Sequence, residues 1–132
     1  MGQAVSNQVS CCSHSGCRIL VLDDEPLILL DLEFAVEDAG CVPVTALELA
    51  EALAIAESGE IVAAILDVSL SHGETCAPVA RALAARGVPY VLHTGDPDRM
   101  EESVRKLGGV LVSKPTPAAT VVSRALEAIP GR

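Results

Sequence analysis

Short apolar runs alternate with helix-like segments along most of this chain, and the alternation limits its fold more than any other feature. The apolar runs cover residues 18–22, 41–44, 61–66, 88–93 and 110–112. Each is followed by a segment with apolar residues at helical spacing, at 27–39, 46–59, 77–86, 98–107 and 118–129. Strict alternation predicts an α/β fold, in which helices cover both faces of a parallel sheet.

The expected sheet has five parallel strands in the order 2-1-3-4-5, as in a flavodoxin-like, doubly wound three-layer sandwich. Right-handed crossovers leave few other orders. Pro43 lies in the second run and cannot donate to a central ladder, so this strand is expected at an edge. Thr45 and Glu48 have the spacing of a capping box, which predicts that the next helix begins at residue 46.

The length of 132 residues is enough for one domain with one core. We expect residues 1–17 to form a flexible N-terminal leader and residues 18–132 to form the folded domain. The leader contains potential metal ligands, but their spacing lacks the paired C-x₂-C arms of a zinc knuckle. A disordered tail is therefore favoured over a metal or redox site formed by Cys11, Cys12, His14 and Cys17.

Charge and hydropathy exclude two classes of partner. The formal net charge is −9, and such a surface is repelled by nucleic-acid phosphates. The apolar runs are far shorter than the roughly 20 residues that span a bilayer, and the polar start of the chain has no secretory signal. We therefore expect a cytoplasmic protein that binds neither nucleic acid nor membrane.

Polar residues stand where the predicted strands end, and open parallel sheets bind ligands at that edge. The first and third strands are neighbours in the expected order, so their acids should meet within a few ångströms. Like charges this close need a positive offset, which Mg²⁺ (or Mn²⁺ in its place) and a lysine can supply. A carboxylate, a metal, a lysine and a hydroxyl predict a phosphoryl-transfer site, formed by Asp23, Asp24, Asp67, Thr94 and Lys114.

Each of these residues also has an ordinary structural interpretation. Asp23 and Asp24 can cap the first helix, Thr94 can be a turn residue and Lys114 a solvated surface charge. His93 is expected to be a strand-end histidine with its hydrogen bonds made. Asp67 is harder to explain in this way, because an acid directly after six apolar residues is costly without a partner. The placement of the whole set at one edge favours a functional site.

From residue 18 to about residue 129 the sequence resembles the receiver domain of bacterial two-component response regulators. The resemblance is carried by VLDDEP, AAILDVSL, HTGD and VSKP, in that order. It implies that Asp67 is the phosphorylated residue and that the Lys114-Pro115 bond is cis. It further implies metal contacts from Asp24, from Asp23 through water, from Asp67, and from the Val68 carbonyl and the Ser69 backbone. Thr94 and Lys114 would contact the phosphoryl group.

The resemblance implies a phospho-acceptor rather than an enzyme with an external substrate. The phosphoryl group would come from a sensor histidine kinase or a histidine phosphotransfer protein. Because only one predicted helix follows Lys114, we expect a single-domain response regulator. It would signal by binding an unknown downstream protein, or would act as a phosphate sink.

Several positions depart from the family pattern. Leu111 stands where the family has its switch aromatic, and Tyr90 lies on the preceding strand. Ser71 stands where a proline is common, and Thr116 replaces an aromatic residue. Ser69 and Asp96 occupy the two positions that tune autodephosphorylation in similar domains, and Asp96 is a candidate to orient the attacking water.

Two other functions stay open on the residues alone. One is a pseudo-receiver, a binding scaffold that is never phosphorylated, which the loss of the aromatic at Leu111 favours. The other is a phosphatase of the haloacid-dehalogenase type, which also uses an aspartyl nucleophile and Mg²⁺. That phosphatase needs a second Asp two residues after Asp67, where Ser69 stands.

Overall fold

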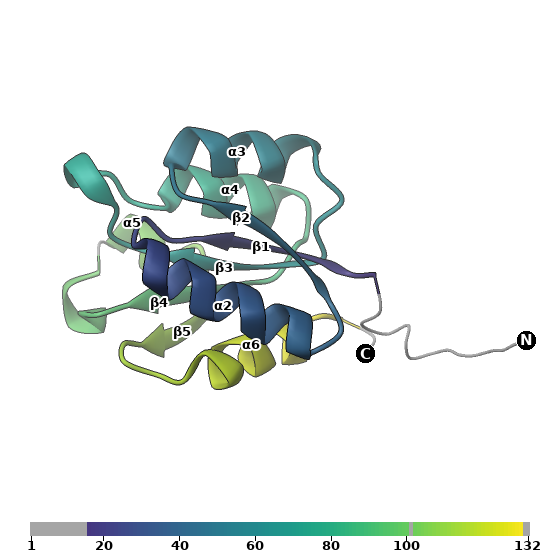
Figure 1. The fold of residues 1–132 in the computed structure, drawn as a ribbon. Helices are drawn as coiled ribbons and strands as arrows, with labels where there is room; N and C mark the ends of the chain where they lie inside the picture. The colour runs from purple at the N-terminus through teal and green to yellow at the C-terminus, as the bar shows by residue number, and fades with distance from the viewer. Residues whose placement is uncertain (1–15, 101, 131–132) are drawn as a thin grey trace, which may run out of the picture.

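The computed structural model describes residues 16–100 and 102–130, with both ends of the described chain on the same side of the molecule (Figure 1). Cys11, Cys12 and His14 lie outside the described residues, so the prediction of a flexible leader is not tested. Among the described residues, no helix is both long and apolar enough to cross a bilayer.

The strands form one parallel sheet in the predicted order. β1 lies between β2 and β3, and β4 lies between β3 and β5. Pro43 is on the edge strand, opposite Ile19. Proline has no N–H, and at this edge no hydrogen bond within the sheet requires one. The strand bounds are Arg18–Leu22 for β1, Val42–Ala46 for β2, Ala63–Asp67 for β3, Tyr90–Thr94 for β4 and Val110–Ser113 for β5.

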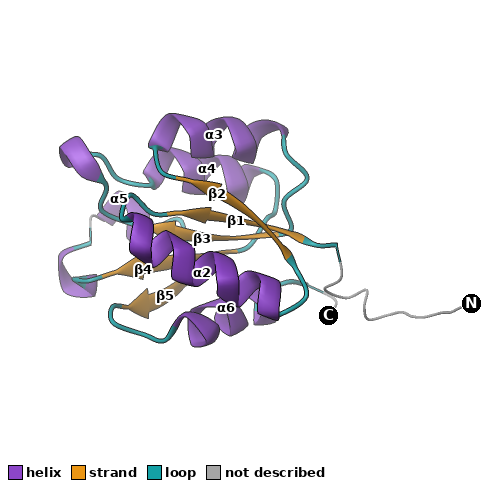
Figure 2. Ribbon diagram, viewed as in Figure 1, coloured by secondary structure: helices purple, strands orange, loops and turns teal. Residues whose placement is uncertain are grey.

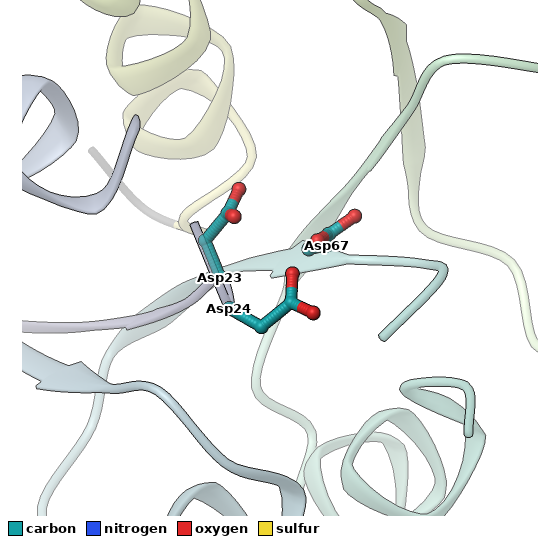
Figure 3. Close-up of side chains that lie close together, drawn as sticks. All are labelled: Asp23, Asp24 and Asp67. Carbon is teal, nitrogen blue, oxygen red and sulfur yellow. The ribbon is translucent and has the colours of Figure 1, made fainter. Parts of the chain in front are cut away.

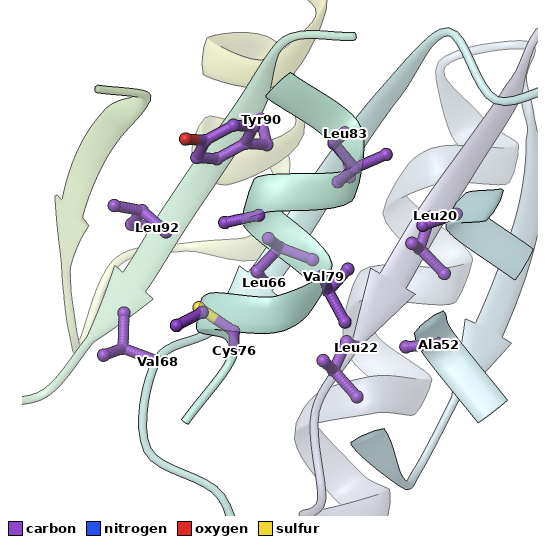
Figure 4. Packing of buried hydrophobic residues seen from close by; sticks show 14 of the residues in the cluster. Leu20, Leu22, Ala52, Leu66, Val68, Cys76, Val79, Leu83, Tyr90 and Leu92 are labelled. Carbon is purple, nitrogen blue, oxygen red and sulfur yellow. The ribbon is translucent and has the colours of Figure 1, made fainter. Parts of the chain in front are cut away.

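Helices cover both faces of the sheet and complete the three layers (Figure 2). Alternate residues of the central strands point to opposite faces. Leu20, Leu22 and Leu66 pack on one face under α3 and α4 (Figure 4), whereas Ile19 and Ile65 pack on the other under α2 and α6. The helix bounds are Pro26–Asp38 for α2, Leu49–Ser58 for α3, Ala77–Ala85 for α4, Glu102–Arg105 for α5 and Ala118–Glu127 for α6.

Only three residues separate β1 from helix α2, so the chain turns sharply at the edge where the acids lie. Pro26 occupies the first turn, where its fixed φ suits the helix and its missing N–H costs nothing. Gly40 ends the helix with a φ of 86°, a conformation that favours glycine. The tight start of α2 keeps Asp23 and Asp24 at the carboxyl end of β1.

Two local predictions are wrong. Thr45 lies inside β2, opposite Val21, so it cannot cap a helix, and α3 has Glu48 as its N-cap residue without a side-chain cap. The single helix expected over 98–107 is also broken: a 3₁₀ turn covers Pro97–Arg99, and α5 is a separate short helix. Met100 between them is extended and packs against the core, which ends the first turn.

Candidate functional site

Three carboxylates meet at the carboxyl edge of the sheet (Figure 3). Asp23 and Asp24 follow β1, and Asp67 is the last residue of the neighbouring β3. One carboxylate oxygen from each lies within 4.8 Å of the other two. The structure therefore brings together the three acids that strand order predicted.

Asp23 and Asp67 are almost completely removed from solvent, being 0% and 4% exposed. Burial raises the pKa of Asp67 to about 7, and the negative charge of Asp23 contributes. Burial likewise raises the pKa of Asp23. Oδ1 of Asp23 accepts the Glu25 N–H at 2.9 Å, but its buried Oδ2 has no hydrogen-bond partner among the described residues. The site is thus short of positive charge and of donors.

Lys114 supplies part of the missing positive charge. Its Nζ lies 3.3 Å from Asp67 Oδ1 and 3.6 Å from Asp23 Oδ2. It is also 3.9 Å from Oε1 of the exposed Glu25. Burial alone would lower the pKa of Lys114, but the carboxylates of Asp67 and Asp23 outweigh it and raise the pKa. The Lys114-Pro115 bond is cis, as the family resemblance implied.

Asp24 is more exposed than the other two acids and is held by a different group. Oγ of Ser71 donates a hydrogen bond to Asp24 Oδ2 at 2.5 Å. This bond is the main reason that the pKa of Asp24 lies below its usual value. Asp24 is therefore the acid of the three that stays ionised most readily.

Thr94 ends β4 at the same edge. Its side chain is buried, and its Oγ1 accepts the Asp96 N–H at 3.1 Å. Its carbonyl accepts the Lys114 N–H at 2.7 Å, which ties the ends of β4 and β5 together. An open cleft of about 510 Å³ lies above these residues and is also lined by Asp24, Asp67, Ser69 and Asp96.

His93 lies beside Asp67 in the sheet register and is 4% exposed. Neither of its ring nitrogens has a hydrogen-bond partner among the described residues, so the expectation of a hydrogen-bonded histidine is wrong. Burial, together with the charge of Lys114, lowers the pKa of His93 to about 4. The neutral ring is consequently the form that the folded protein favours.

These side chains fit a hard divalent cation. Carboxylate oxygens are the ligands that Mg²⁺ prefers, and the buried Oδ2 of Asp23 accepts no hydrogen bond among the described residues, although Lys114 Nζ lies 3.6 Å from it. Asp23, Asp24 and Asp67 would hold the ion. The metal contacts expected from the Ser69 backbone and from the Val68 carbonyl stay predictions. The Val68 carbonyl accepts a hydrogen bond from the Cys76 N–H at 3.1 Å.

Of the positions that depart from the family pattern, Ser71 contacts Asp24, whereas Leu111 and Thr116 lie on or just after β5. Leu111 is 39% exposed on β5. Tyr90 is buried at the opposite end of β4 from Thr94, and its hydroxyl donates to the Leu107 carbonyl at 3.0 Å. Tyr90 is therefore part of the core and does not replace the missing aromatic. Thr116 Oγ1 donates to the Ser113 carbonyl at 2.5 Å.

Sequence reasoning did not assign a role to two residues that contact the site. Glu25 reaches Lys114, and its place directly after the Asp23-Asp24 pair was the available signal. Ser71 contacts Asp24 across 47 positions. It was noted only because it replaces a proline, and no local pattern predicted its contact.

Several solved structures similar to this chain are response-regulator receivers. The receiver protein from Sinorhizobium medicae WSM419 is 25% identical, with a TM-score of 0.75, over 86% of this chain and 96% of that one. SdrG from Sphingomonas melonis Fr1 is 43% identical, with a TM-score of 0.71, over 86% and 95%.

A third neighbour has the same fold at lower identity. It is a response regulator from Burkholderia pseudomallei, solved with a phosphorylated aspartic acid, a calcium ion and citrate. It is 18% identical, with a TM-score of 0.73, over 83% of this chain and 66% of that one. No family model and no curated protein matches the sequence.

Proposed function

The chain belongs to the family of response-regulator receiver domains, and on this basis we propose that it accepts a phosphoryl group on Asp67. The observation that carries the proposal is the position of the Asp67 carboxylate, which lies beside Asp23, Asp24 and Lys114 and lines an open cleft. A nucleophile that faces an accessible cleft and is surrounded by charge-compensating groups suits in-line phosphoryl transfer.

The proposed donor is the phosphohistidine of a sensor kinase or of a phosphotransfer protein. An Asp67 oxygen attacks phosphorus, the new P–O bond forms, and the P–N bond breaks with its electron pair left on the imidazole. A divalent cation, when bound, neutralises charge on the transferred oxygens. Lys114, whose Nζ lies 3.3 Å from Asp67 Oδ1, would pair with the same oxygens. The Thr94 hydroxyl, at the neighbouring strand end, is the proposed hydrogen-bond donor to the phosphoryl group.

An exposed apolar surface beside the cleft supports docking of a protein donor. Leu27, Leu30 and Phe34 lie on α2 at helical spacing and are 79%, 42% and 55% exposed. The helix begins two residues after Asp24, so a partner that packs on this surface would stand next to the acids. Contiguous exposed apolar side chains favour a protein partner over a small substrate.

Phosphotransfer from a radiolabelled, autophosphorylated histidine kinase tests the proposal. Label should move to the wild-type chain in Mg²⁺ and not in EDTA, and it should not move to Asp67→Asn. Absence of transfer from any kinase of the source organism, with no labelling by acetyl phosphate either, would favour the pseudo-receiver. Steady turnover of a phosphomonoester would favour the phosphatase.

A further inference from the structure

The Asp24 side chain is the least constrained of the three acids. Asp23 and Asp67 are buried, so surrounding atoms fix their side chains, whereas Asp24 is only half-buried. Repulsion between ionised carboxylates favours rotation of this side chain into water, and hydrogen bonds with the Asp67 side chain and the Ser71 backbone oppose that rotation. A further side-chain contact helps to keep this carboxylate turned towards the other two.

Ser71 makes that contact from the loop after β3. Its hydroxyl donates to Asp24 Oδ2 at 2.5 Å, so one carboxylate oxygen is fixed while the other stays available to a ligand. A hydrogen bond to an ionised carboxylate is stronger than one between neutral groups. The Asp24–Ser71 pair also separates two hollows, since both residues line the cleft above Asp67 and a groove of about 500 Å³ between the start of α3 and the loop after β3.

The backbone of the loop fixes the position of Ser71. The Leu70 N–H donates to the Glu74 carbonyl at 2.8 Å, and the Cys76 N–H donates to the Val68 carbonyl at 3.1 Å. Between these bonds, His72 has a φ of 66°, a left-handed conformation that is uncommon for a residue other than glycine. The hydroxyl is therefore held by a closed loop rather than by a free surface segment.

We propose that Ser71 is a positioning residue for the divalent cation, and that it holds Asp24 in the orientation that binds the ion. This inference rests on the proposed function, because it assigns a role within the same site. Outer groups that orient a metal ligand typically change metal affinity by about 10- to 100-fold when they are removed. Ser71 itself contacts Asp24 and not the reacting atoms.

Calorimetric titration of the full chain with Mg²⁺ tests this role in four proteins. Ser71→Ala should raise the dissociation constant about tenfold or more, and Ser71→Thr, which keeps a hydroxyl, should restore it close to the wild-type value. Ser58→Ala is the matched control, because Ser58 Oγ makes a hydrogen bond of 2.8 Å to the Ala54 carbonyl on α3, away from the site. It should bind Mg²⁺ as the wild type does.

A second readout separates positioning from chemistry. Phosphorylation of Ser71→Ala by acetyl phosphate should be slow at limiting Mg²⁺ and should reach the wild-type rate at saturating Mg²⁺. Wild-type affinity in Ser71→Ala, or equally weak binding in Ser71→Thr, would overturn the positioning role while the proposed function stands. Absence of Mg²⁺ binding by the wild type would contradict the proposed function itself.

Discussion

Lys114 Nζ lies 3.3 Å from Asp67 Oδ1, although the two residues are 47 positions apart in the chain and two strands apart in the sheet. The same ammonium group lies 3.6 Å from Asp23 Oδ2. One cation therefore offsets two buried carboxylates, whose pKa values are both raised. The charge balance of the site depends on this lysine and on a bound divalent cation. Removal of the lysine charge should therefore change the affinity of the site for the cation.

Removal of the Lys114 charge should strengthen Mg²⁺ binding. Lys114→Met keeps the apolar stem but removes the ammonium group that repels an incoming cation. We expect the Mg²⁺ dissociation constant to fall severalfold, and the ion-free protein to lose about 2 kcal/mol of unfolding free energy at pH 8. Calorimetry and urea denaturation measure the two effects. Lys106→Met, at an exposed position, is the control, and an unchanged Mg²⁺ affinity in Lys114→Met would contradict the proposed charge balance.

Asp67 should destabilise the ion-free protein as pH rises. Its pKa is about 7 when folded against 3.8 in the ordinary state, so folding disfavours its ionised form. This contribution is absent below pH 4, grows between pH 4 and pH 7, and reaches at most about 4 kcal/mol. Asp67→Asn should therefore be more stable than wild type above pH 7 in EDTA.

Urea denaturation of both proteins from pH 4 to pH 8 gives the difference directly. Asp38→Asn, which changes an exposed acid at the end of α2, is the matched control and should show no such trend. A constant difference between wild type and Asp67→Asn across this range would show that Asp67 is not perturbed.

His93 should have the opposite pH dependence. Its pKa is lowered from 6.5 to about 4, so the folded protein disfavours its charged form. Its contribution to stability is therefore lost as pH falls from 6.5 to 4, by about 3 kcal/mol. His93→Leu should resist acid better than wild type and should not be less stable at pH 7, because the ring makes no hydrogen bond with the described residues.

The pH profile of wild-type stability should hide both effects, since Asp67 and His93 change stability in opposite directions over nearly the same range. Each single variant should reveal the slope of the other group. Parallel profiles of wild type and His93→Leu between pH 4 and pH 6.5 would refute the assignment to His93.

Asp96 is expected to shorten the lifetime of the phosphorylated state. It lines the cleft next to Thr94 and Asp67, where it can orient a water molecule towards the phosphoryl group. Asp96→Ala should slow the loss of phosphate from Asp67 severalfold without preventing its formation. Decay of the phosphorylated chain, followed by intact mass after the donor is removed, measures this. An unchanged decay rate would exclude the role.

The sequence predicted the sheet order and the acidic site because both follow from strand polarity. Apolar runs marked the strands, Pro43 identified the edge strand, and residues at strand ends had to share one edge of the sheet. The third and fourth predicted strands were expected to end at Asp67 and at Thr94, and these are the last residues of β3 and β4. Polar side chains do not prevent these residues from belonging to the strands, because the hydrogen bonds of a sheet are made by backbone groups.

Loop geometry could not be predicted in the same way. The contact between Ser71 and Asp24 depends on the fold of a loop in which His72 takes a left-handed conformation, and no periodic pattern encodes this. Thr45 matched a capping box, but pairing of β2 with β1 extended the strand through it. In each case a long-range contact determined the local structure.

The most direct test of the central claim is the intact mass of the chain after incubation with acetyl phosphate and Mg²⁺. We predict a gain of one phosphoryl group that is labile to hydroxylamine. This gain should not form when EDTA replaces Mg²⁺, and it should be absent in Asp67→Asn. A wild-type mass that stays unchanged in Mg²⁺, or a gain that persists in Asp67→Asn, would contradict phosphorylation at this site.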